Sequence, residues 1–476
     1  MRFLLLLSAL SLVLAACEAG FDSDDSQAPT PIVITSTPSD GAPGDAPTNE
    51  PDATATATEA DNGTPTATAD DAPPTPTQDG QATATPAEDN DATRALIEEI
   101  QRQVVELRGL DILEDINEEI IDRDELAVRI QDIIAEEYSP EEGQTDALTY
   151  WLLRLIPDRE IDLYQLQIDL YNEQVAGYYD PEAGDLVVVT DDGVLAAFDK
   201  VTMAHEIVHA LQDQHFDLVA IDENHGTDAD RRAAISALVE GDASLAMTQY
   251  MFEYLGPQEL IEMLGEALVG GEEYEVLENA PRYIADGLLF SYEAGQEFAM
   301  ALYEAGGYAA IDAALADPPL STEQILHPEK FIGPERDDPL DVQNPDISNE
   351  LGDGWDVVRS DSLGEWDLRI MLEENGVDAP TAATATEGWG GAWLDVYTSD
   401  RDALALLTTR WDSEQDATEF GGALLDSFQS DAQFGAVWSE DGRYFSAIAG
   451  GDTVVLISGT DQASVNAVLA VMSQTV

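Results

Sequence analysis

Two histidines four residues apart constrain this chain more than any other feature of its sequence. They lie in the run His205-Glu206-Ile207-Val208-His209, where a helix would place both imidazoles on one face, about one turn apart. Imidazoles at this spacing can bind one metal ion, and Glu206 can then lie beside the water on that ion. The apolar neighbours of the run predict that the helix is buried. The sequence therefore predicts a core helix that carries half of a metal site.

The rest of the metal site must come from elsewhere in the chain. Cys17 is the only cysteine and lies in a predicted export signal, so the third ligand must be His, Asp or Glu. His215 follows His209 by six residues, but Gln212 stands where a glycine would be needed to break the helix between them. Glu240 interrupts the apolar pattern of a second predicted helix, where a buried carboxylate needs a compensating partner. We therefore favour Glu240 as the third ligand, with His215 as the alternative.

The first 17 residues have the pattern of a bacterial lipoprotein signal. Met1 and Arg2 precede an apolar run that is too short to span a bilayer, and this run ends in Leu14-Ala15-Ala16-Cys17. In proteins with such a signal the cysteine is diacylated through its sulfur and becomes the new N-terminus. We therefore expect an extracytoplasmic protein that is lipidated at Cys17 and anchored to a bacterial cell membrane.

Residues 18–92 consist mainly of Ala, Thr, Pro, Asp and Gly, with almost no large apolar side chains. Such a segment cannot bury enough apolar surface to offset its ordering entropy, so we predict a disordered stalk. The whole chain is strongly acidic, with 97 Asp and Glu against 19 Lys and Arg and a net charge of −78. This charge argues against nucleic acid as a partner, because phosphates would be repelled.

The remaining sequence predicts two folded domains, 93–335 and 352–476, separated by a Pro- and Asp-rich linker. The first is mainly helical and contains a predicted hairpin at 175–190, whose edge strand could bind an extended substrate or simply belong to the core. The second combines six strand-like runs with three helical ones and has no histidine. The predicted fold class is therefore α+β, with a mainly helical domain and a short edge sheet followed by a smaller α+β domain.

Four segments carry a resemblance to a known family: VAGYYDP, HEIVHALQDQHFDL, ALVEGDASL and STEQILHPEKF. In this order they resemble zincin metallopeptidases of the gluzincin type, and in particular a largely uncharacterised group of bacterial lipoprotein metallopeptidases. The resemblance covers roughly residues 96–333. It implies a zincin-like fold in which His205, His209 and Glu240 bind Zn²⁺ and Glu206 acts as general base and acid in peptide hydrolysis.

Hydrolysis by this route also needs a second group that stabilises the oxyanion, usually a tyrosine or histidine. His327, Tyr179, Tyr283 and Tyr292 are candidates, and we select His327 as a second catalytic residue.

Two other sets of residues have both a functional and a structural interpretation. Asp213 and Asp242 could accept the ring N–H of a ligand histidine, or they could be solvated charges. The Trp and Gly cluster at 389–393 could border a substrate groove, although packing in a core is the more usual role of such side chains.

We therefore expect a monomeric, membrane-tethered zinc peptidase that acts on peptides or proteins outside the cytoplasm. One alternative is a surface binding or scaffold protein without turnover, and another is a zinc hydrolase of cell-wall amides. The intact Glu206 favours catalysis, because binding of zinc does not require this carboxylate whereas hydrolysis does.

Overall fold

The computed structural model of the chain describes residues 87–190, 195–224, 228–269, 274–429 and 431–475. The predicted signal, the lipidation site at Cys17 and most of the predicted stalk lie outside these residues. The first helix begins at Ala87, so residues 87–92 are helical rather than part of the stalk to which their composition assigned them. Among the described residues, no helix combines the length and the apolar character needed to cross a bilayer.

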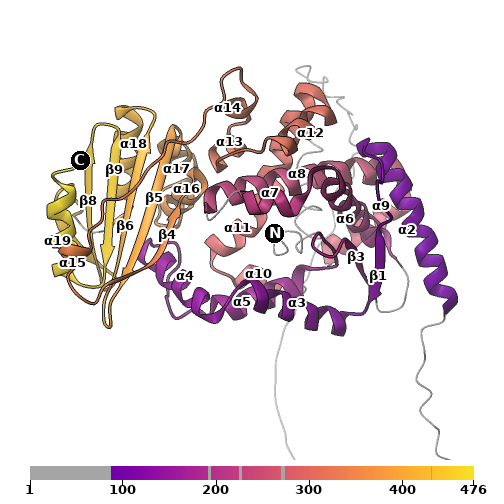
Figure 1. Cartoon of the computed structure of the whole chain (residues 1–476), viewed down its shortest axis with the longest axis horizontal. Coiled ribbons are helices and arrows are strands. Elements are labelled where there is room, and N and C mark those ends of the chain that lie inside the picture. The colour runs from indigo at the N-terminus through magenta and orange to yellow at the C-terminus, as the bar shows by residue number, and fades with distance from the viewer. Residues whose placement is uncertain (1–86, 191–194, 225–227, 270–273, 430, 476) are drawn as a thin grey trace, which may run out of the picture. The chain divides into compact units, whose positions relative to one another are not determined.

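The N-terminal part of the described chain is mainly helical (Figure 1). Its helices are α2 (Ala87–Arg108), α3 (Arg123–Glu137), α4 (Pro140–Leu152), α5 (Leu163–Gln174), α6 (Ala197–Phe216), α7 (Leu218–Asn224), α8 (Ala229–Tyr254), α9 (Pro257–Val269), α10 (Glu275–Asn279), α11 (Arg282–Gly306), α12 (Tyr308–Ala316), α13 (Thr322–Leu326) and α14 (Pro328–Ile332). Sequence signals explain several of the helix starts. Ser139 and Glu142 form a capping box before α4, and the Asp228 side chain accepts a hydrogen bond from the Arg231 amide at the start of α8.

A small sheet accompanies these helices, with strands β1 (Asn117–Ile121), β2 (Gly177–Asp180) and β3 (Asp185–Val189) in the order β1–β3–β2. Antiparallel pairing of β2 with β3 confirms the predicted hairpin, and β2 is an edge strand. The sequence analysis missed β1, because glutamate is uncommon in strands. Its two glutamates are accommodated by ion pairs, since Glu119 contacts Arg129 at 2.7 Å.

Helix α8 runs through the core of the helical part and packs against α6 on one side and α11 on another. Its contact with α11 is unusually close. A Cβ atom on Gly241 would lie 2.0 Å from the carbonyl oxygen of Gly295, and one on Gly295 would lie 2.2 Å from that of Ala237. The two helices therefore touch through their backbones, one residue away from Glu240, and only glycine allows this approach.

The C-terminal part is built on a six-stranded antiparallel sheet, in the order β4–β5–β6–β9–β8–β7. Its elements are α15 (Ser348–Leu351), β4 (Asp356–Ser362), α16 (Glu365–Glu374), α17 (Ala379–Thr386), β5 (Trp389–Thr398), β6 (Ala403–Trp411), α18 (Glu414–Asp426), β7 (Val437–Glu440), β8 (Arg443–Gly450), β9 (Thr453–Gly459) and α19 (Gln462–Met472). All six predicted strands are present, and so are the three predicted helices. Helix α17 was missed because its sequence, APTAATAT, has the composition of the predicted stalk.

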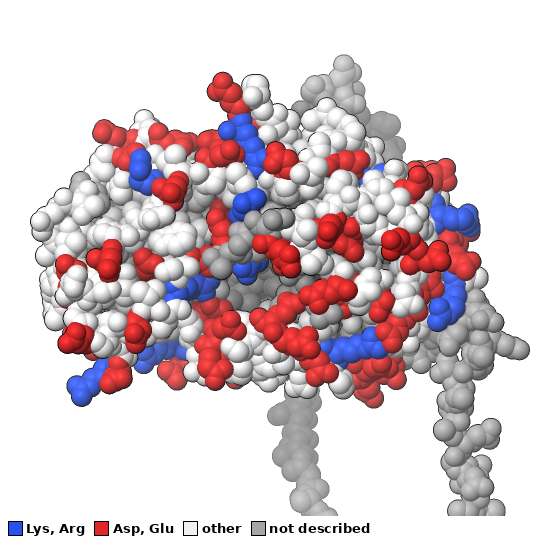
Figure 2. Space-filling model, viewed as in Figure 1, with Lys and Arg blue, Asp and Glu red and all other residues white. Residues whose placement is uncertain are grey.

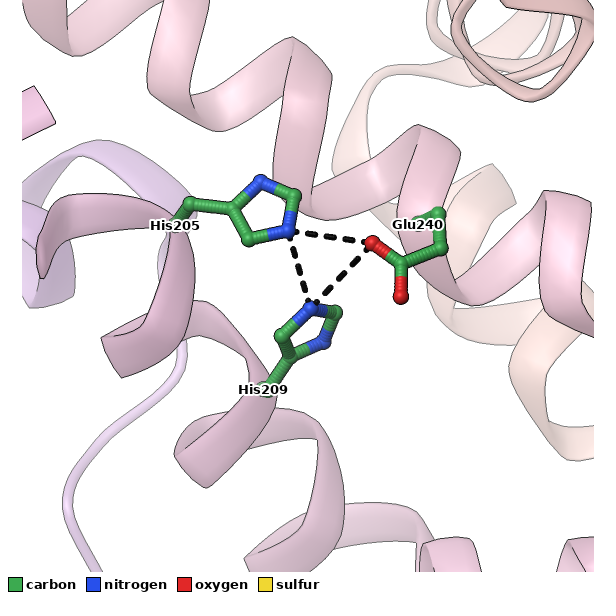
Figure 3. A group of neighbouring side chains, drawn as sticks. All are labelled: His205, His209 and Glu240. Atoms are coloured by element: carbon green, nitrogen blue, oxygen red, sulfur yellow. Dashed lines mark hydrogen bonds and ion pairs between the residues drawn. The ribbon is translucent and has the colours of Figure 1, made fainter. Parts of the chain in front are cut away.

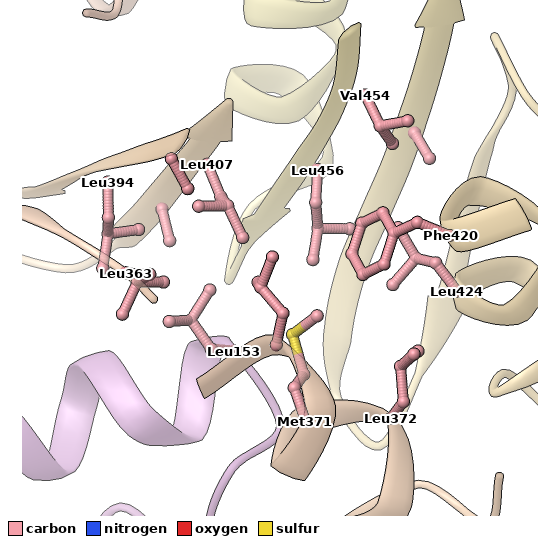
Figure 4. Close-up of a cluster of buried hydrophobic side chains, with 14 of the residues drawn as sticks. Leu153, Leu363, Met371, Leu372, Leu394, Leu407, Phe420, Leu424, Val454 and Leu456 are labelled. Atoms are coloured by element: carbon pink, nitrogen blue, oxygen red, sulfur yellow. The ribbon is translucent and has the colours of Figure 1, made fainter. Parts of the chain in front are cut away.

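Alternate residues of each strand pack on opposite faces of this sheet, as the two-residue period of a strand requires. On β6, Ala405 and Leu407 face α16, α17 and α18, whereas Leu404 and Leu406 face α15 and α19. The first face also receives Leu153, from the end of α4, which lies among Leu363, Met371 and Leu456 in Figure 4. The helical part and the sheet therefore share one apolar core.

The Trp and Gly cluster at 389–393 belongs to this core. Trp389 is buried in the same cluster as Trp411 and Phe420, which supports the packing interpretation. Trp393 is half-buried, and its ring N–H donates to Asp395. The predicted α+β class, with a mainly helical part followed by a β-rich part, is confirmed.

Candidate metal centre

Helix α6 is buried on all sides, because every residue from Val201 to Gln212 is buried. Four polar side chains of this stretch, His205, Glu206, His209 and Gln212, have no solvent-exposed surface. Polar groups removed from water must be compensated by hydrogen bonds or a bound ion. The contacts of these four residues therefore show how their burial is compensated.

His205 and His209 turn their Nε2 atoms toward one point, as the spacing of the motif predicted (Figure 3). Glu240 of α8 points its Oε2 atom at the same place. The two Nε2 atoms are 3.0 Å apart, and Oε2 lies 3.0 Å from His205 Nε2 and 3.4 Å from His209 Nε2. Three ligands of a tetrahedral zinc ion at 2.0–2.1 Å would be about 3.3 Å apart, close to this triangle. The geometry fits a small divalent cation.

The electrostatics of the cluster also fit a cation. Glu240 has no exposed surface, and its Oε1 atom has no hydrogen-bond partner in the described part of the chain. Although desolvation works to raise it, His209 and His205 hold the pKa of Glu240 at about 2. The carboxylate is therefore ionised and buried next to two imidazoles. A buried charge of this kind destabilises the fold unless it is paired, and a metal ion would supply the pairing.

Gln212 holds His209 in position. The ring Nδ1 of His209 lies 2.9 Å from Gln212 Oε1, and the amide of Gln212 donates to the Val239 carbonyl and to Asp242. Asp242 in turn forms a fully buried ion pair with Arg108, at 2.8 Å. Since a ligand histidine needs a partner for its second nitrogen, this chain of contacts fixes the ring with Nε2 facing the cluster.

The structure also shows where the alternative residues lie. Gln212 lies inside α6, which continues to Phe216, so the helix does not break after His209. His215 is consequently turned away, and its ring bonds to the carbonyl of Asp111. Asp242 is linked to His209 through Gln212, whereas Asp213 accepts hydrogen bonds from the Tyr179 hydroxyl and the Leu218 amide. The sequence analysis missed Gln212 as a partner of His209, although its position one helical turn after that histidine was the available signal.

The carboxylate of Glu206 is fixed by the neighbouring edge strand. The backbone N–H of Tyr179, in β2, donates to Glu206 Oε2 at 2.9 Å. All four residues of β2 are buried. Of the two interpretations of the hairpin, these contacts fit a structural element that orients Glu206 better than an open edge for strand addition.

Tyr292 is the candidate oxyanion group that lies next to the cluster. Its ring centroid is 6.2 Å from that of His205, and its hydroxyl is buried close to the Glu240 carboxylate. Burial, and then the nearby Glu240 and Glu206 carboxylates, raise the pKa of Tyr292 well above its usual range, so the hydroxyl remains a donor. Tyr292 lies one turn before Gly295 on α11, so the close crossing of α11 and α8 sets its position.

The other oxyanion candidates have partners elsewhere. The Tyr179 hydroxyl donates to Asp213, and the Tyr283 hydroxyl donates to Asp367 at 2.7 Å. His327, which the sequence analysis selected as catalytic, pairs with Glu365 of α16 at 3.1 Å. None of the hydrogen bonds or ion pairs described for His327 is to the cluster, so the structure places it at the junction of α13, α14 and α16.

A second group of carboxylates has metal-like spacing: Glu323, Asp337 and Asp412. This group already contains a cation of the protein. The ammonium of Lys330 lies 2.5 Å from Glu323, 3.3 Å from Asp337 and 3.4 Å from Asp412. It is therefore a lysine-centred ion-pair cluster, in contrast to the site between α6 and α8.

Comparisons with known proteins add little about function. Residues 349–469 match a family described as a domain of unknown function (DUF8575), which covers only the β-rich part of the chain. No curated protein matches the sequence. A crystal structure from Chloroflexus aurantiacus, described as a "putative hydrolase with a novel fold", matches 52% of this chain and 89% of its own, with 16% identity and a TM-score of 0.32. That similarity is too weak to support an argument, so the function must be argued from the site.

Proposed function

We propose that this chain is a zinc-dependent hydrolase that cleaves peptide bonds. The observation that carries the proposal is the convergence of His205 Nε2, His209 Nε2 and Glu240 Oε2 on one buried point. Two imidazoles and one carboxylate form the ligand set of many catalytic zinc sites, which keep a further position open for water or substrate. Zinc at such a site supplies Lewis acidity, which polarises a carbonyl group and acidifies water.

Glu206 is the proposed general base. It lies next to His205 on α6, and the Tyr179 amide holds one of its oxygens. The carboxylate takes a proton from the attacking water and then delivers it to the leaving amine. Zinc binding alone would not require this carboxylate, so its burial beside the ligands favours a hydrolase over a binding protein.

Tyr292 is the proposed donor to the oxyanion. Its hydroxyl is protonated and buried beside the Glu240 carboxylate, so a hydrogen-bond donor lies next to a proposed metal ligand. Removal of one such donor in other enzymes lowers kcat by about 10²–10³. We expect a loss of this size for Tyr292→Phe, with unchanged zinc content.

The decisive experiment compares Glu206→Gln with the parent chain. We expect the variant to bind as much zinc as the parent and to lose at least about 10²-fold in cleavage of casein or of a peptide library. Glu253→Gln, at an exposed position on α8, is the matched control and should cleave like the parent. A Glu206→Gln chain as active as the parent would contradict the proposal. A parent chain that binds zinc but cleaves no substrate would favour a binding or scaffold role.

We also propose that the protein acts outside the cytoplasm, tethered by a lipid on Cys17. The support is the Leu-Ala-Ala-Cys sequence at the end of the N-terminal apolar run. In detergent phase partitioning, the bacterially expressed parent should enter the detergent phase and Cys17→Ser should remain in the aqueous phase. Equal partitioning of the two would contradict lipidation.

A further inference from the structure

A cleft of about 750 Å³ is bordered by α5, by the first turns of α11 and by the turn between β2 and β3. Leu163, Gln167 and Leu170 line it from one face of α5, and Ile284 and Leu288 line it from α11. Its volume is in the range of about 300–1,000 Å³ that ligand sites occupy. The cleft is therefore large enough for several residues of a peptide.

Two chain segments run from the cleft to the proposed active site. Leu288 is four residues before Tyr292 on α11, which is about 6 Å along the helix. Pro181 lines the cleft two residues after Tyr179, whose amide holds Glu206. The cleft and the metal cluster are thus connected through α11 and through β2 with the turn that follows it.

The lining of the cleft differs from the rest of the protein in its aromatic content. Five of its nineteen lining residues are Tyr or Trp, whereas Phe, Trp and Tyr together make up 7% of the chain. The lining also contains five carboxylates and a single arginine. Acidic side chains are spread over the whole visible face of the molecule, so charge alone does not mark the cleft (Figure 2). The cleft is distinguished by the combination of its concave shape, its aromatic walls and its excess of negative charge.

We infer that this cleft is the substrate site and that it accepts an extended peptide with Lys or Arg side chains near the scissile bond. This inference rests on the proposed function. The long apolar stems of Lys and Arg pack on aromatic walls while their charged ends reach carboxylates. Walls of one charge sign in a concave site also concentrate ligands of the opposite sign.

Glu182 and Glu223 are the carboxylates best placed to select the charge. Both are exposed, and both line the cleft. Glu182 is three residues after Tyr179, so its Cα lies within about 10 Å of that of Tyr179. Its turn is rigid, because Asp180 Oδ1 accepts hydrogen bonds from the Glu182 and Ala183 amides. The Cα of Glu182 is therefore within about the length of three extended peptide residues of the Cα of Tyr179, whose amide holds the proposed base.

The test measures binding separately from turnover. The full chain with Glu206→Gln, loaded with zinc, is titrated with two fluorescent peptides of equal length, one with Arg at alternate positions and one with Glu. We expect the basic peptide to bind at least about tenfold more tightly at low salt, with the difference shrinking as salt is added. Adding Glu182→Gln and Glu223→Gln should weaken binding of the basic peptide severalfold.

The control replaces two exposed carboxylates of α18, in Glu414→Gln with Glu419→Gln, which changes the net charge equally and leaves the cleft intact. Equal binding of both peptides, or equal losses from the cleft pair and the control pair, would overturn the inference. If the parent cleaves casein but shows no charge preference, the inference fails and the proposed function stands. If the cleft pair weakens binding but no chain cleaves any substrate, the proposed function fails and the binding site stands.

Discussion

The interface between α6 and α8 and the core beneath the six-stranded sheet are equally buried but have opposite chemistry. Under the sheet, fully buried residues such as Phe420, Phe445 and Leu394 make an apolar cluster. Between the helices, two imidazoles and two carboxylates are as completely buried. Apolar burial stabilises a fold without a ligand, whereas buried charges destabilise it unless something compensates them. From this comparison we propose that the sheet stabilises the fold and that the helical interface binds a ligand.

The largest effect that tests this comparison is loss of a large side chain under the sheet. Phe445→Ala should lower the free energy of unfolding by about 3–5 kcal/mol, because the ring leaves a cavity in a close-packed core. Zinc bound per folded chain should not change. Denaturant unfolding and metal analysis of the same sample test both points, and Phe252→Ala, at a ring that is 62% exposed, should have an effect within about 0.5 kcal/mol. A loss of zinc in folded Phe445→Ala would mean that the two regions are not separable.

Gly295→Ala tests the close contact of α11 and α8. The new methyl group would lie 2.2 Å from the Ala237 carbonyl, so the helices must move apart, and we expect a loss of about 1–3 kcal/mol. Because Tyr292 moves with α11, turnover should fall more than the stability loss explains. Gly265→Ala, where nothing lies within 4 Å of the new atom, should be neutral or stabilising. If Gly295→Ala has the same free energy of unfolding and the same turnover as the parent, the position of α11 does not depend on this contact.

Gln212→Ala removes the partner of the His209 ring without changing a proposed ligand. Loss of such a group lowers metal affinity by about 10–100-fold in other proteins, and we expect the same here. Competition with a zinc-binding dye measures the affinity. Gln214→Ala is the matched control on the same helix, because the Gln214 side chain bonds only to backbone atoms of 113–114 in the described contacts. Equal zinc affinities of the two variants would show that Gln212 does not support the site.

The smallest expected effect is a pH dependence outside the site. Its hydrogen bond to Glu365 raises the pKa of His327 against desolvation, so the folded state binds this proton more tightly than the unfolded state. The pair therefore adds stability that is fully present below the ordinary histidine pKa of about 6.5 and is lost as pH rises through the raised value. The parent should therefore be more stable than His327→Gln by at most about 1 kcal/mol at pH 5, and by less at pH 9, in measured free energies of unfolding. A difference that grows with pH would contradict this sign.

The parts that the sequence predicted are those encoded locally. Strand alternation located all six strands of the sheet, and the four-residue spacing located His205 and His209 on one helix face. Glu240, which the structure places beside both histidines, was selected because it interrupts an apolar helical pattern. The parts that were missed depend on distant or backbone partners. Arg108 meets Asp242 from 134 residues away, and the group that holds Glu206 is a main-chain N–H of β2, which has no signature in a sequence.

The central claim is that the buried charges between α6 and α8 hold one metal ion. Zinc content of the purified full chain tests it most directly, measured after incubation with zinc and removal of the excess, in parallel with Glu240→Gln. The account predicts about one zinc per parent chain and almost none in Glu240→Gln, with unchanged circular dichroism. A parent chain that holds no zinc, or a Glu240→Gln chain that holds as much as the parent, would contradict it.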